Sequence, residues 1–185
     1  MKRAPPIVAS PSKKDSTSSS RAEFLAKCAA ASAAVALQLG CPSSAQVRPE
    51  SGACPEEARN AMFEGWEKPG ALRLEPGDSV QVIIDRNQPG NPGVPGVFRD
   101  GPVTGVVSDG FKYFPRGTVL YGRLWTGDGT FILARYTEAH LPDGRTVPVC
   151  LAIGEDGPVE PYKNSKPGAV RYSRSEVAFV VDRWP

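Results

Sequence analysis

Histidine, cysteine and long apolar runs are scarce in this sequence, and each shortage excludes a class of function. The chain of 185 residues has one histidine, His140, and four cysteines without a Cys-x-x-Cys pair. Zinc sites need clustered cysteine and histidine ligands, so we expect no metal and no other cofactor. No Gly-x-Ser-x-Gly elbow or kinase signature is present, and nothing marks a pair of catalytic carboxylates. We therefore predict no catalytic residues and no enzyme, with His140 as a surface residue beside a turn.

Without residues 1–45, the chain has no large excess of positive or negative charge. Six of the 22 basic and two of the 20 acidic residues lie in 1–45, which leaves 16 and 18 and a net charge of −2. Binding to the phosphate backbone requires a basic surface. Nucleic acid is therefore excluded as a partner.

The apolar stretch nearest the start is too short to span a membrane. Residues 1–27 are rich in Lys and Arg, residues 28–47 carry no charge, and 29–39 are mostly Ala, Val and Leu. A spanning helix needs about 20 apolar residues, so an uncleaved membrane anchor is the less favoured alternative. A positive segment, a short apolar segment and small residues in that order predict a secretory leader over 1–45, followed by a tether over 46–54.

Cys41 leaves two ways of processing this leader open. Gly40 before it favours lipidation of Cys41, although Gln38 stands where an aliphatic residue is preferred. Cleavage after Ala45, with Ser43 two places before it, satisfies the small-x-small pattern of ordinary secretion. Both routes predict export, to the periplasm or a lipid-anchored place at the outer membrane, or to the medium. Contact with a membrane is expected only through a lipid on Cys41.

The same two cysteines remain under both routes. Cys54 and Cys150 are left after processing at either place, and an oxidising compartment favours their pairing. We predict a Cys54–Cys150 disulfide, the alternative being two unrelated buried thiols.

Glycine and proline, 19 of each, together with apolar residues that lack a helical period, predict short strands joined by tight turns. We expect one mainly β domain over 55–185, a small antiparallel β-barrel or sandwich with a β-meander. One short N-terminal helix should run from Pro55 to about Glu64, since proline and acidic residues suit a first turn. The other expected elements are a strand, turn and strand in 71–85, a surface loop over 86–98, a strand at 102–108, a meander over 117–154 and a last strand in 169–182.

The first meander hairpin predicts a binding surface. If Gly127-Asp128-Gly129 is a three-residue loop, one face carries Tyr121 opposite Arg135, Arg123 opposite Leu133 and Trp125 opposite Phe131. The opposite face then carries small apolar residues typical of a core: Leu120 with Tyr136, Gly122 with Ala134 and Leu124 with Ile132. Aromatic and arginine side chains are enriched in recognition surfaces. We predict binding by Tyr121, Arg123, Trp125, Phe131 and Arg135, with Arg135 over Tyr121 in solvent. The alternative is that the aromatic residues pack under a second sheet while the arginine tips reach solvent.

Three patterns in this region carry a family resemblance. They are a Gly-Thr-x-Leu-x-Gly-x-Leu strand, an Arg-Tyr-Thr strand and a Pro-Asp-Gly hairpin ending in Pro-Val-Cys, at 117–124, 135–137 and 142–150. On these residues the chain resembles small secreted or lipoprotein-like proteins of myxobacterial type, often labelled serine/threonine kinase or kinase-associated. The resemblance implies an Ala-rich leader before a β domain and no defined function. More weakly, 115–124 is similar to barrel domains of type IV secretion outer-membrane complexes, which implies architecture only.

These observations predict an exported, envelope-associated domain that binds a protein or a cell-envelope polymer without catalysis. One alternative is a structural component of an envelope or secretion assembly, which a long exposed edge strand would favour. The other is a hydrolase with an unrecognised site, which a deep polar cleft containing His140 would favour.

Overall fold

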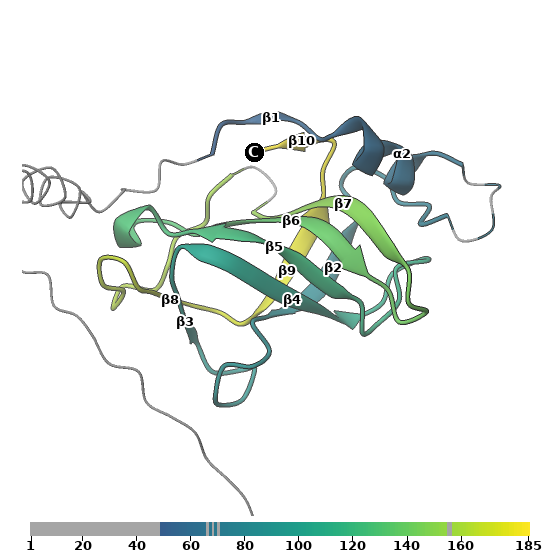
Figure 1. Ribbon diagram of the computed structural model, residues 1–185. Coiled ribbons are helices and arrows are strands. Elements are labelled where there is room, and N and C mark those ends of the chain that lie inside the picture. Colours follow the sequence, from purple (N-terminus) through teal and green to yellow (C-terminus); the bar gives the residue numbers. More distant parts are fainter. Residues whose placement is uncertain (1–48, 66, 68, 70, 155–156) are drawn as a thin grey trace, which may run out of the picture. The chain divides into compact units, whose positions relative to one another are not determined.

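Six antiparallel strands close into a barrel in the order β2-β4-β5-β6-β7-β9 (Figure 1). The strands are β2 Ser79–Ile84, β4 Gly101–Asp109, β5 Val119–Trp125, β6 Leu133–His140, β7 Thr146–Ile153 and β9 Ser175–Val180. The predicted mainly β architecture is therefore confirmed as a barrel, and β5, β6 and β7 form the predicted meander.

The structure is a computed structural model that describes residues 49–65, 67, 69, 71–154 and 157–185. The chain divides into two units, and every described residue belongs to the second, Ala45–Pro185. The leader predicted over 1–45, with Cys41, lies outside the described residues. Within the described part of the chain, no helix is long and apolar enough to cross a membrane.

Along a barrel strand, side chains point alternately into the barrel and away from it. The inward-pointing side chains fill the interior. In β2, Val80, Val82 and Ile84 are buried in this way. The ring of Tyr136 is also fully buried, and its hydroxyl lies 2.9 Å from where a Cβ would stand at Gly105. The absence of a side chain on β4 at this point therefore makes room for the tyrosine on β6.

Two small sheets lie outside the barrel. The first pairs β1 Gly52–Ala53 with β10 Arg183–Trp184, so the last residues of the expected tether form a strand. The second pairs β3 Gly96–Phe98 with β8 Val170–Tyr172. All four strands have only two or three residues.

The observed strands correct three expectations, two of them through the second small sheet. The surface loop predicted over 86–98 ends in β3, and the single strand predicted in 169–182 is divided into β8 and β9. The first strand predicted in 71–85 is absent, although Leu72 and Leu74 are buried there. Burial of two alternating leucines does not need a strand, because irregular chain can also place apolar side chains on the core.

Arg174 holds the proline- and glycine-rich segment that leads to β3. Its side chain is almost fully buried, and its Nη atoms donate to the carbonyl oxygens of Asp85, Arg86, Pro89 and Gly90 at 3.2–3.4 Å. A guanidinium offers five donors in a rigid plane, so one side chain can satisfy several carbonyl groups of a loop without a ladder.

The predicted helix and disulfide are both present beside β7. Helix α2, Glu56–Phe63, begins directly after Pro55. Cys54 and Cys150 are bonded, with their Cα atoms 6.2 Å apart, which confirms the predicted pairing. Met62 on α2 is fully buried, and its sulfur accepts a hydrogen bond from the backbone N–H of Cys150 at 3.2 Å. The helix is therefore fastened to β7 at both of its ends.

Candidate binding surface

The outer face of β5 and β6 brings together four of the five predicted binding residues. Arg123 lies opposite Arg135, and Trp125 lies opposite Leu133. Tyr121, two residues before Arg123, shares this outward side because side chains alternate along a strand. The intervening residues Leu120 and Leu124 are buried inside the barrel, as predicted.

The predicted register of this hairpin is wrong by two residues, because the loop is longer than Gly127-Asp128-Gly129. A 3₁₀ turn occupies Gly127–Gly129, and Ile132 then pairs with Val159 instead of with β5. Phe131 consequently lies in the loop, not opposite Trp125. Its ring packs so closely on Gly127 that a Cβ there would collide with it. Phe131 is half-buried at this place and does not belong to the outer face.

A hollow of about 520 Å³ opens on this outer face. Residues from three strands line it: Tyr121, Gly122, Arg123 and Trp125 from β5, Arg135, Thr137 and Glu138 from β6, and Trp184 from β10. Trp184 was not among the predicted residues. It is far from the hairpin in sequence, and no local pattern signals that it folds back onto β6.

A β-bulge in β6 lies at the polar part of the hollow. Tyr121 pairs with Glu138 and Gly122 pairs with Tyr136, so Thr137 is an extra residue in β6. The bulge leaves Thr137 and Glu138 exposed together, where a regular strand would turn one of them inward. Gly122 permits this close approach, because a Cβ at that position would overlap the carbonyl oxygen of Arg135.

Arg135 is the floor of the hollow and not an exposed contact residue. It is 7 % exposed, and its guanidinium lies 5.8 Å from the ring of Trp125 and 5.4 Å from that of Trp184. Its Nη atoms also donate to the main-chain oxygens of Glu50 at 3.1 Å and Pro185 at 2.6 Å. The expectation that Arg135 would lie over Tyr121 in solvent is therefore wrong. Strands β1 and β10, which precede and follow the barrel strands in the sequence, pair with each other above β6 and β7 in Figure 1, and residues next to them accept the hydrogen bonds of Arg135.

Tyr121 and Arg123 form the exposed part of the surface. Tyr121 is 40 % exposed, and the Arg123 guanidinium lies 5.9 Å from the Trp125 ring on the open side. The Tyr121 ring also packs on that of His140, at 4.5 Å between centroids. The Nε2 atom of His140 in turn contacts the Glu138 carboxylate.

His140 is exposed near a turn, as expected, but sequence reasoning did not find its partners. It ends β6, with 44 % of its side chain exposed, and Glu138 lies two residues before it. Residues two apart share one face of a strand, so this pair could have been found from the alternation alone. Among the described residues, no group of three or more His, Cys, Asp or Glu side chains could hold a metal ion.

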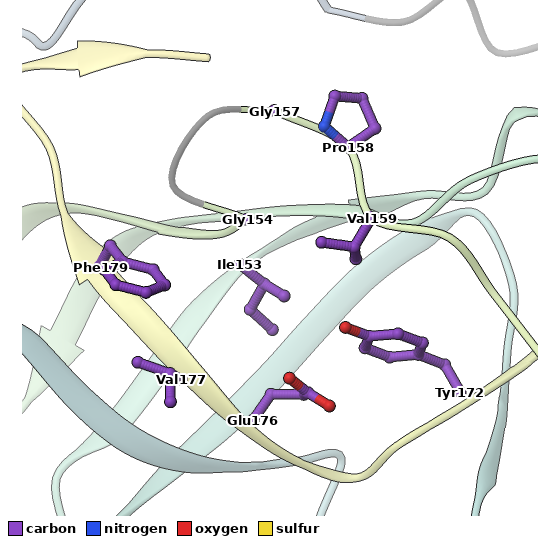
Figure 2. A pocket seen from close by; sticks show the side chains of 9 residues that line it. All are labelled: Ile153, Gly154, Gly157, Pro158, Val159, Tyr172, Glu176, Val177 and Phe179. Carbon is purple, nitrogen blue, oxygen red and sulfur yellow. The ribbon is translucent and has the colours of Figure 1, made fainter.

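The described residues also form two other hollows and bury one phenol inside the barrel. One hollow, of about 1020 Å³, lies between the segment 85–100 and strands β4 and β5. The other, of about 550 Å³, lies beside the end of β7 and the start of β9 (Figure 2). Inside the barrel, the Tyr136 hydroxyl has no hydrogen-bond partner among the described residues. Burial, and secondarily the charge of Asp85, raise the pKa of Tyr136, so this phenol stays protonated.

Comparison with known proteins gives no relative from which a function could be transferred. No model of a known protein family matches the chain. A search of curated protein sequences finds no match either. What the chain binds is therefore inferred from its own surface.

Proposed function

We propose that this chain is an exported, envelope-associated domain that binds a protein or a cell-envelope polymer and catalyses no reaction. The binding surface is the hollow on the outer face of β5 and β6. One observation carries the proposal. The ring of Trp125 has two guanidinium groups near it, that of Arg123 at 5.9 Å and that of Arg135 at 5.8 Å from its centroid. Arg135 is fixed among main-chain oxygens, and Arg123 is exposed.

A rigid aromatic surface favours binding because little freedom is lost when a ligand arrives. Trp125 and Trp184 are held by the buried guanidinium of Arg135, so their rings are already in place. Tyr121 and Arg123 add an exposed ring and an exposed cation beside them. Such a surface can stack on a planar or apolar part of a ligand and pair with its negative or hydrogen-bonding groups.

The Cys54–Cys150 disulfide supports export, since such bonds persist mainly in oxidising compartments. Processing at Cys41 or after Ala45 is part of the same proposal. Intact mass of the protein from fractionated cells distinguishes a lipid on Cys41 from cleavage after Ala45. Cys41→Ser should release the protein from membranes if the lipid is attached. Recovery of a cytosolic protein that retains Met1 would contradict export.

Two alternatives were an assembly component, which a long exposed edge strand would favour, and a hydrolase, which a deep cleft containing His140 would favour. The described residues support neither. The barrel is closed, and the strands outside it in the described part of the chain have two or three residues, so a long exposed edge is not offered there. His140 lies on the outer surface with 44 % of its side chain exposed, and not in a deep cleft. The binding proposal is therefore preferred over an assembly component and over a hydrolase.

The sharpest test places a photo-crosslinking residue at position 123 in living cells. We expect an adduct with a protein or with envelope polymer from position 123 and none from position 116, because Arg116 is exposed but does not line the hollow. Tyr121→Ala should reduce the adduct several-fold, since it removes a ring that lines the hollow. Tyr113→Ala removes another exposed tyrosine and should leave the adduct unchanged. Equal adducts from positions 123 and 116 would contradict the proposal.

A further inference from the structure

The hollow of about 550 Å³ beside the end of β7 has mostly apolar walls (Figure 2). Ile153 closes it on the β7 side, Val159 lies across from it, and Val177 and Phe179 border it from β9. Hollows of 300 to 1,000 Å³ are the usual size of small-ligand sites, as an order of magnitude. A side chain of a few carbons can therefore enter between these walls.

Two polar groups, Tyr172 and Glu176, converge in this apolar space. Figure 2 shows the Tyr172 hydroxyl and the Glu176 carboxylate pointing into the same hollow. Tyr172 is 8 % exposed, and burial raises its pKa, with the Glu176 charge and a hydrogen bond to Glu176 adding to the effect. The phenol thus stays protonated, with its O–H directed into the same space as the Glu176 carboxylate.

Glu176 carries a negative charge that the hollow does not balance. It is the only charged side chain among the described residues that line the hollow. No lysine, arginine or histidine in the described part of the chain forms an ion pair with it. A carboxylate in partly apolar surroundings is stabilised by a cation that brings its own hydrogen-bond donors.

We propose that this hollow binds a primary ammonium group on an unbranched aliphatic arm, the lysine side chain of a partner protein. The arm lies between the apolar walls, and the ammonium meets the Glu176 carboxylate. Lysine buries its methylene groups readily while its charged end finds a polar partner. The rings of Tyr172 and Phe179 are close enough to the same space to favour a cation. This site is separate from the outer face of β5 and β6 and does not depend on its function.

Two features select lysine over related cations. A guanidinium prefers to meet both oxygens of a carboxylate in one plane, whereas the Tyr172 side chain shares the hollow with Glu176 and narrows the approach to its carboxylate. An ammonium is a compact charge that needs only one oxygen. A free diamine would bring a second ammonium into the hollow, and Glu176 is the only carboxylate among the described lining residues.

The test titrates the disulfide-bonded exported protein with small probes and follows the backbone amide signals of Val177 and Phe179. Nα-acetyl-lysine N-methylamide should bind about tenfold more tightly than the norleucine analogue, which keeps the arm and lacks the ammonium. The arginine analogue and 1,5-diaminopentane should both bind more weakly than the lysine analogue. Glu176→Gln should lower affinity for the lysine analogue to that of norleucine. Glu160→Gln, an exposed acid outside the hollow, should have no effect.

Equal binding of the lysine and norleucine probes would overturn the proposal without any variant, so misfolding of Glu176→Gln cannot obscure the result. Unchanged lysine affinity in folded Glu176→Gln would overturn it as well. Tighter binding of 1,5-diaminopentane would assign the hollow to a free diamine and reject a lysine partner. An absence of signal changes with the lysine analogue would also reject it.

Discussion

At the scale of single residues, two arginines placed directly opposite each other, Arg123 on β5 and Arg135 on β6, have different roles. Arg123 is exposed, whereas Arg135 is 7 % exposed and donates to main-chain oxygens of Glu50 and Pro185. Like charges that face each other across strands repel. Here the Trp125 ring lies 5.9 Å from the Arg123 guanidinium and 5.8 Å from that of Arg135, and its π-electrons attract both cations. Carbonyl oxygens that accept hydrogen bonds from Arg135 further offset the repulsion between the two arginines.

Arg135→Ala should therefore destabilise the fold, whereas Arg123→Ala should not. We expect Arg135→Ala to lower the free energy of unfolding by about 2 to 3 kcal/mol, because hydrogen bonds to a charged group and the packing of two tryptophans are lost. Arg123→Ala should change it by less than about 0.5 kcal/mol, as is usual for surface positions. Leu124→Ala, which leaves a cavity inside the barrel, should cost about 2 to 5 kcal/mol and serves as the reference. Urea unfolding measures all three, and equal stability of the two arginine variants would contradict the assignment.

The turn residue Asp143 makes the stability of the fold depend on pH in the acid range. Its carboxylate accepts hydrogen bonds from the backbone N–H and then the side chain of Arg145, which lower the pKa of Asp143. A group with a lowered folded-state pKa stabilises the fold above its unfolded pKa, and this contribution is lost as the pH falls through the folded pKa. Asp143→Asn should flatten the melting temperature against pH below about pH 4. Asp109→Asn, an exposed control, should retain the wild-type profile.

At the scale of elements, the bulge in β6 depends on a glycine in β5. Gly122→Ala would bring a Cβ against the carbonyl oxygen of Arg135. We expect a loss of about 2 kcal/mol or more in the free energy of unfolding, because backbone must move to relieve the overlap. The bulge residue Thr137 would also shift, so the amide signals of Thr137 and Glu138 should change.

Gly52→Ala is the matched control for this prediction. It also lies in a strand, and a Cβ there would meet no atom within 4 Å. The two variants lose the same glycine flexibility in the unfolded chain, so a difference between them reports the overlap alone. Similar melting temperatures for both would show that β5 and β6 can separate freely at Gly122.

The elements that sequence predicted well are the longer strands of the meander. Strands β5, β6 and β7 have seven or eight residues, are rich in apolar residues and are joined by turns that contain glycine. Strands β1, β3, β8 and β10 have two or three residues, too few to show an alternation. Their pairing is set by contacts with distant chain, so no local pattern could reveal them.

The candidate binding surface was predictable in its central strand and not at its edges. Alternation along β5 correctly placed Tyr121, Arg123 and Trp125 on one side. The two-residue error in register arose because Ile132 pairs with Val159 outside the hairpin. A distant pairing of this kind extends a loop beyond what its turn residues indicate. The burial of Arg135 was not predictable either, because the residues that accept its hydrogen bonds, Glu50 and Pro185, are distant from it in sequence.

At the scale of the whole molecule, the Cys54–Cys150 disulfide closes a loop with a sequence separation of 96 residues. Reduction should lower the free energy of unfolding by about 4 kcal/mol, since the open chain has more unfolded conformations. The double variant Cys54→Ala with Cys150→Ala should show the same loss and no response to reductant. Urea unfolding with and without reductant measures both effects. A reduced protein as stable as the oxidised one would contradict this.

That same bond determines the path of a mechanical load through the domain. Tension applied to the chain ahead of Cys54 passes through the two sulfur atoms to Cys150, and so enters the barrel at β7. Helix α2 and strands β2 to β6 lie in the bypassed loop, so a pull cannot peel them away in sequence. In reduced protein the load would reach α2 first and then β2. Stretching a single oxidised molecule from that side should therefore give a shorter extension on unfolding than stretching a reduced one.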